Sequence, residues 1–117
     1  MPASYRELTV WRKAMDVAVQ VYQLTERFPK HEMYRLTSQA TRAAASVPAN
    51  IAEGNGRATR RDYANFLAIA KGSLNETETF LFLAMRLGYL CEHETAPTLD
   101  LITEVGKMLT VLRGRLV

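Results

Sequence analysis

Apolar residues recur at alternating steps of three and four positions in four successive stretches of this 117-residue chain. That spacing places them on one face of an α-helix, and no stretch shows the period-two alternation of a β-strand. The first stretch ends at Phe28, because Pro29 denies the next backbone N–H and disfavours helix before it. Its main apolar track is Val10, Ala14, Val17, Val21, Leu24 and Phe28, with a parallel track at Trp11, Met15, Ala18 and Tyr22.

The second helix is expected to begin between Tyr34 and Thr37 and to stop at Gly54. Pro48 lies inside it and removes one backbone hydrogen bond, which predicts a kink. The apolar spacing continues through Ile51, so we interpret this stretch as one kinked helix and not as two helices.

Helix signals also bound the last two stretches. Thr59, followed three residues later by Asp62, predicts a capping box at the start of a long third helix that ends at Gly88. In the last stretch Pro97 is best tolerated within a first turn, which favours a start near Thr95.

Short connections make successive helices antiparallel neighbours. The sequence therefore predicts an all-α fold, an up-down-up-down antiparallel four-helix bundle, with residues 1–117 as a single domain. A hydrophobic content of 48% is enough for one core.

Features that the sequence lacks indicate the expected compartment and exclude some kinds of partner. It has no apolar leader at its start and no run of about 18 apolar residues, so we expect a cytoplasmic protein without a membrane partner. Cys91 is the only cysteine, which excludes an internal disulfide. A formal net charge of +3 permits an acidic partner without requiring one.

The catalytic motifs that bundles and α/β enzymes use are missing. His31 and His93 each lack the glutamate three residues earlier that a carboxylate-bridged di-metal centre needs. There is no glycine-rich phosphate loop and no nucleophile elbow. We therefore predict no catalytic residue, no cofactor and no metal.

Polar side chains on the second and third helices form a candidate structural network. Arg42, Ser46 and Asn50 follow one another at steps of four, Glu53 comes one turn later, and Glu76 lies on the third helix. Buried charges are tolerated only when they are paired, so we interpret this set as fixing helix register. A ligand site on the carboxylates is the competing interpretation.

Arginines cluster between the second and third helices at Arg57, Arg60 and Arg61. The start of a helix disfavours cations, so these residues are not there to stabilise the third helix. Together with Arg12 and Lys13 they are candidate nucleic-acid contacts. The competing interpretation is a solvated, mildly basic surface without a readout motif.

The third helix is apolar nearly all round near its end, although a bundle helix needs to bury only one stripe. Its outer face carries small, uncharged or apolar residues that would let another helix approach. This face predicts an oligomer interface formed by Ala68, Gly72, Asn75, Thr79, Phe82 and Leu83.

Several stretches, in this order, resemble the bacterial four-helix-bundle proteins encoded in intervening sequences of 23S ribosomal RNA genes. The most specific are Pro-Ala-Asn-Ile-Ala-Glu-Gly at 48–54 and Gly-Ser-Leu-x-Glu at 72–76. The complete set is Tyr5–Trp11, Phe28–Lys30, Leu36–Gln39, Ser46–Gly54, Gly72–Thr79 and Leu87–Leu90.

The resemblance implies a four-helix bundle, a ring-like homo-oligomer of five subunits, and no established enzymatic activity. A related branch, the accessory variability proteins of diversity-generating retroelements, binds nucleic acid and reverse transcriptase through a positively charged pentamer. By analogy, our leading hypothesis is a non-enzymatic accessory or scaffold factor that binds RNA, DNA or a nucleic-acid-processing protein. The alternative is a purely structural protein–protein interaction module.

Overall fold

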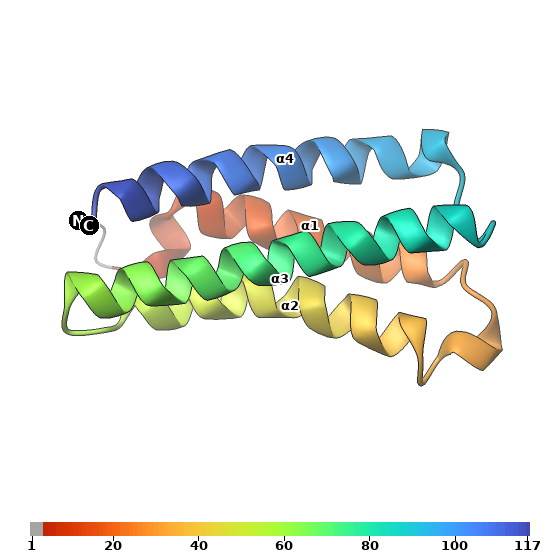
Figure 1. The fold of residues 1–117 in the computed structure, drawn as a ribbon, viewed down its shortest axis with the longest axis horizontal. Coiled ribbons are helices and arrows are strands. Elements are labelled where there is room, and N and C mark those ends of the chain that lie inside the picture. The colour runs from red at the N-terminus through yellow and green to blue at the C-terminus, as the bar shows by residue number, and fades with distance from the viewer. Residues whose placement is uncertain (1–3) are drawn as a thin grey trace.

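Four long helices run side by side along one axis in the computed structural model, which describes residues 4–117 (Figure 1). Each helix packs against two neighbours, in the cycle α1–α2–α3–α4–α1. This is the predicted all-α four-helix arrangement. The helices are α1 (Thr9–Thr25), α2 (Leu36–Asn55), α3 (Arg60–Arg86) and α4 (Glu92–Gly114), with short 3-10 turns at Tyr5–Glu7 and Lys30–Glu32.

The core is formed by the apolar stripes that the sequence predicts. The main track of the first stretch is buried from Val10 to Phe28, although α1 itself ends at Thr25 and not at Phe28 as predicted. Met15 and Tyr22 of the parallel track are 39% and 53% exposed. Because α2 and α4 are the two long helices that pack against α1, one stripe is enough to fill its side of the core. The largest fully buried apolar side chains are Ile51, Leu67, Leu74, Leu81, Leu109, Val17, Val21, Val47 and Val105.

Helix α2 continues through Pro48, as the prediction of one helix requires. Proline has no backbone N–H, so the Ala44 carbonyl loses its usual partner one turn later. Pro48 is buried, and the burial of its ring offsets part of that loss.

The start of α4 differs from the prediction. The helix begins at Glu92 and not near Thr95, so Pro97 stands in the second turn. Glu94 Oε1 accepts a hydrogen bond from the Cys91 backbone N–H at 2.7 Å, which satisfies a donor that the helix start leaves unpaired. The capping box is harder to recognise from the sequence because a cysteine occupies the N-cap, where serine or threonine is usual. At α3, Thr59 Oγ1 accepts from the Asp62 N–H at 3.1 Å, which is one of the two hydrogen bonds of the predicted capping box.

The described helices include none that is both long and apolar enough to cross a membrane.

The helix glycines fall into two kinds. A Cβ added at Gly54 would lie 2.7 Å from Phe66 Cβ and 3.1 Å from Tyr63 Cδ1, so α2 and α3 can approach this closely only with glycine there. A Cβ at Gly106 would meet Leu74 Cδ2 at 3.5 Å, an ordinary contact, and one at Gly72 would meet nothing within 4 Å. The fold therefore requires Gly54 but not the other two.

Alanine substitutions should separate these two kinds of glycine. We expect Gly54→Ala to lower the free energy of unfolding by about 1–3 kcal/mol, because the new methyl group clashes across the α2–α3 contact. Gly106→Ala should raise it by about 0.5–1 kcal/mol, because alanine favours the helix and fits the available space. Urea unfolding followed by circular dichroism measures both. If Gly54→Ala and Gly106→Ala changed the free energy of unfolding equally, the two glycines would not differ in the way proposed here.

Candidate functional site

The up-down order of the helices brings the start of α1, the α2–α3 turn and the end of α4 to one end of the bundle (Figure 1). Seven arginines meet there, with only three carboxylates, Glu7, Glu53 and Asp62, in the same segments. The excess of four positive charges exceeds the formal net charge of +3 of the whole chain. We call this set the basic end: Arg6, Arg12, Arg57, Arg60, Arg61, Arg113 and Arg115.

The opposite end of the bundle is balanced in charge. It combines the α1–α2 loop with the α3–α4 connection and carries as many carboxylates as cations. The molecule is therefore polarised along its long axis. The residues at this end are Arg27, Lys30, Arg35 and Arg86 against Glu26, Glu32, Glu92 and Glu94.

Arg57 is oriented by two neighbours. Its Nη2 lies 3.1 Å from Glu53 Oε1 one turn earlier, and its guanidinium lies over the Phe66 ring at 4.6 Å from the ring centroid. Stacking on an aromatic face is a common arrangement for arginine and leaves the other face of the guanidinium open.

Two other arginines join the start of α3 to the end of α4. Arg60 Nη2 donates a hydrogen bond to the Arg115 backbone carbonyl, and Arg113 Nε donates to the Ala64 carbonyl at 3.3 Å. Carbonyl oxygens orient a guanidinium without neutralising its charge. These contacts therefore position positive charge at the basic end without cancelling it.

The remaining predicted nucleic-acid contacts differ from one another. Arg12 Nε donates to the Arg6 carbonyl at 2.8 Å, which keeps it at the basic end. Lys13 instead pairs with Glu104 at 2.5 Å, so its charge is offset. The guanidinium of Arg61 has no hydrogen bond or ion pair to any residue within 4–117. Four of the five predicted residues thus lie at the basic end, and the charges of Lys13 and Arg57 are each offset by a carboxylate.

Arg6, Arg113 and Arg115 are visible in the sequence as further basic positions near its start and end, but the sequence does not place them beside Arg57–Arg61. They are far from Arg57–Arg61 in the chain, and only the bundle topology brings them together. The available signal was that each lies close to a helix end that an up-down bundle places on the same side.

The predicted polar network forms only in part. Ser46 Oγ lies 2.9 Å from Ser73 Oγ, and Asn50 Nδ2 donates to both the carbonyl and the hydroxyl of Ser46 at 2.8 Å. Arg42 and Glu76 line a shallow hollow beside the two serines, yet both are exposed. Glu53 lies outside the network, because its exposed carboxylate pairs with an arginine of the basic end.

A buried carboxylate at the opposite end was not foreseen. Glu32 is only 5% exposed, accepts a hydrogen bond from Tyr89 Oη at 2.7 Å and lies 3.6 Å from Arg35 Nε. The Tyr89 hydrogen bond holds the pKa of Glu32 below its ordinary value although burial opposes this, and the same bond raises the pKa of Tyr89. A satisfied, ionised carboxylate of this kind joins the α1–α2 loop to the residues after α3 and is a poor proton carrier at neutral pH.

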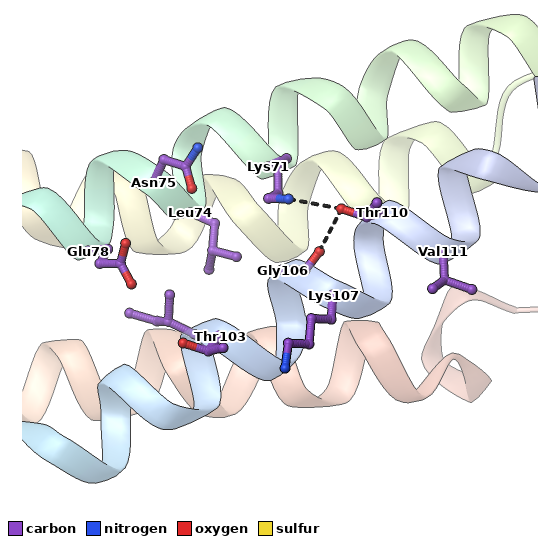
Figure 2. A pocket seen from close by; sticks show the side chains of 10 residues that line it. Lys71, Leu74, Asn75, Glu78, Thr103, Gly106, Lys107, Thr110 and Val111 are labelled. Atoms are coloured by element: carbon purple, nitrogen blue, oxygen red, sulfur yellow. Dashed lines mark hydrogen bonds between the residues drawn. The ribbon is translucent and has the colours of Figure 1, made fainter.

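A groove runs between α3 and α4 (Figure 2). It contains a hollow of about 540 Å³ with Leu74, Ile102 and Gly106 among the residues that line it. Lys71 Nζ donates to Thr110 Oγ1 at 2.9 Å across the groove, and Thr110 Oγ1 donates to the Gly106 carbonyl at 3.0 Å.

The residues predicted to form an oligomer interface all lie at the surface of α3. Phe82 and Leu83 are 47% and 43% exposed. Ala68, Gly72, Asn75 and Thr79 are exposed as well, and Asn75 borders the α3–α4 groove. Within residues 4–117 there is also no group of three histidine, cysteine or acidic side chains placed to hold a metal ion.

Comparison with known proteins gives a family and a fold. The model of the 23S rRNA-intervening sequence protein family matches residues 6–111. A crystal structure of a protein of unknown function from the S23 ribosomal protein family of Bacteroides thetaiotaomicron is similar, with 28% sequence identity and a TM-score of 0.80. That similarity covers 90% of this chain and 98% of the other. The comparison with curated proteins found no match.

The pKa of Glu32 leads to a pH-dependent prediction. A lowered pKa stabilises the folded chain above the unfolded value of about 4.3, and that contribution is lost as the pH falls through the lowered pKa. The raised pKa of Tyr89 acts in the opposite sense, contributing below about pH 10 and fading above it. Glu32→Gln should therefore lower the thermal unfolding midpoint most near neutral pH. The difference in unfolding midpoint between Glu32→Gln and the wild type should become smaller below about pH 4. Glu76→Gln, at an exposed position, should have nearly the wild-type midpoint at every pH.

Proposed function

The chain belongs to the 23S rRNA-intervening sequence protein family, and from that premise we propose a non-catalytic, self-associating protein whose basic end binds nucleic-acid phosphates. The observation that carries this proposal is the meeting of seven arginines from three separate segments at one end of the bundle. The similar crystal structure is that of a protein of unknown function. The proposal therefore rests on the residues of this chain.

The position of the arginines favours a ligand over a structural role. Arg60 and Arg61 stand in the first turn of α3, where the helix dipole opposes positive charge. A cation there costs about 0.3–1 kcal/mol, so helix stability gives no reason to place two arginines together. A bound phosphate would reverse that balance, because anions are stabilised at a helix start.

Arginine is also the side chain suited to this ligand. Its planar guanidinium binds phosphate through two parallel hydrogen bonds and keeps its charge at all physiological pH values. Arg57 is already held by Phe66, and Arg60 by a backbone carbonyl, so less side-chain entropy remains to be lost on binding.

The expected binding is independent of base sequence. Phosphate contacts position a protein on nucleic acid, whereas base contacts specify sequence. The basic end offers charge at several points and has no recognised readout element, so the affinity should depend strongly on salt.

Self-association would increase the positive charge that a nucleic acid meets. Exposed Phe82 and Leu83 on α3 provide apolar area for a subunit contact. A ring of five subunits, which the family resemblance implies, would bring five basic ends into one assembly. Each end adds an excess of positive charge to the field that attracts the polyanion.

Two arginines of α3 give a matched test. Arg61 lies at the basic end and Arg86 at the other end of the same helix, and both are exposed. We expect Arg61→Ala to weaken binding of labelled RNA and duplex DNA equally and to reduce the slope of log affinity against log salt by about 1 per lost phosphate contact. Arg86→Ala should leave both unchanged.

The wild-type result decides between the two functions considered. Salt-sensitive binding of either nucleic acid supports the proposal. An oligomeric wild type that binds neither one at low salt would contradict it and would favour the protein–protein interaction module.

A further inference from the structure

We propose that the basic end takes unpaired nucleic acid, because two of its arginines are held ready to stack on exposed bases. This inference rests on the proposed function above and names the form of nucleic acid that the site binds. The guanidinium carbon of Arg6 lies 5.9 Å from the centroid of the Tyr5 ring, and that of Arg57 lies 4.6 Å from the centroid of the Phe66 ring. Both arginine–aromatic pairs found within residues 4–117 therefore belong to the basic end.

An arginine supported by a ring on one side has a second flat face. Arg6 and Arg57 are both exposed, so the face that points away from the ring is open to a ligand. Unpaired bases stack on guanidinium planes as they do on aromatic rings. A base on the open face would complete a stack of ring, guanidinium and base.

The ion pair of Arg57 favours this use of the side chain. Glu53 Oε1 lies 3.1 Å from Arg57 Nη2 and offsets its charge, so Arg57 attracts phosphate less strongly than an arginine without a carboxylate partner. The N–H groups of a guanidinium lie in its plane, and a carboxylate that accepts from them sits at the edge. Glu53 therefore holds the plane of Arg57 in place and leaves its open face free for a base.

The Arg6–Tyr5 pair is held by the short turn before α1. Ser4 Oγ accepts a hydrogen bond from the Arg6 backbone N–H at 3.2 Å, and the Leu8 N–H donates to the Tyr5 carbonyl at 3.0 Å. The Tyr5 ring also packs edge to face with Trp11, at 5.1 Å between ring centroids and an angle of 81°. Because the turn is already ordered, binding a base there costs little further loss of conformational freedom.

The two pairs flank the end of α2. The turn at Tyr5–Glu7 packs on α1 and α2, whereas Phe66 belongs to α3 and lies against α2 at Gly54. Since α2 lies between α1 and α3, one pair is on each side of it. A single strand that crosses the end of α2 would place bases on both pairs and phosphates beside Arg60 and Arg61.

This arrangement distinguishes a single strand from a duplex. In a duplex the bases are paired and stacked on one another, so their flat faces are covered along the helix. A single strand can turn its bases outward onto side chains. Every base has such a face, so stacking adds affinity without selecting a sequence, in agreement with the lack of a readout element at the basic end.

A strand without bases separates stacking from phosphate binding. The wild type is titrated at one salt concentration with a labelled DNA single strand and with an abasic strand of the same length. The normal strand should bind about tenfold more tightly per stacked base, with the same salt slope because the phosphates are equal in number. Equal affinities would overturn the inference and leave phosphate binding intact. Binding of neither strand at low salt would overturn both.

Substitution of the supporting rings tests which residues stack. Phe66→Leu and Tyr5→Leu remove a ring without changing the charge, and Tyr34→Leu, on a tyrosine that is 89% exposed near the opposite end, is the matched control. The first two variants should weaken binding of the normal strand about tenfold and leave its salt slope and the abasic affinity unchanged. The control should bind as the wild type does. Equal losses with both strands would overturn the inference, because the rings would then serve phosphate binding alone.

Trp11 reports on the strand at the Arg6–Tyr5 pair. It is the only tryptophan of the chain and contacts Tyr5, so a base stacked there should quench its fluorescence. We expect quenching at saturation with the normal single strand but not with the abasic strand or with the annealed duplex. The same emission in all three complexes would overturn the inference for this pair, and equal quenching by the duplex would overturn the preference for unpaired bases.

Discussion

The close packing of α2 against α3 at Gly54 is the contact on which the other features depend. With no Cβ between them, the helix backbones come close enough for Phe66 and Tyr63 to pack directly over the glycine. This contact fixes where the α2–α3 turn lies, and the turn carries Arg57 and the first residues of α3. Because that turn lies beside the start of α1 and the end of α4, a packing constraint in the hairpin determines where the positive charge of the molecule gathers.

The two ends of the bundle show different ways of handling charge. At the basic end, the guanidinium groups of Arg60 and Arg113 are oriented by backbone carbonyls, which do not neutralise their charge, whereas Arg57 lies on an aromatic ring and pairs with Glu53. At the opposite end, Glu32 is buried and fully satisfied by Tyr89 and its other neighbours. The first arrangement favours association with a polyanion, whereas the second stabilises the fold.

Periodicity predicted the helices well because each must bury a stripe against its neighbours, as the burial of Val10 through Phe28 shows. The start of α4 was predicted wrongly, because it was placed from Pro97 and a cysteine N-cap concealed the capping box. Periodicity also could not foresee Glu32, because a loop residue has no periodic partner. For the candidate site, the local cluster of Arg57, Arg60 and Arg61 was visible in the sequence. The arginines near the termini were added by topology, and Lys13 was removed by a pairing across helices that no local pattern encodes.

The Glu32–Tyr89 hydrogen bond also has a mechanical consequence. The chain forms two helical hairpins, α1–α2 and α3–α4, which are joined covalently only by the turn at the basic end. Elsewhere they are held together by the packing of α2 on α3 and of α1 on α4, and at the far end also by the ion pair between Arg27 and Glu94 at 3.0 Å. Glu32 in the loop of the first hairpin bonds to Tyr89 in the connection of the second, at the end far from that turn. The hydrogen bond and this ion pair therefore oppose separation of the hairpins at the end where no turn of the chain joins them.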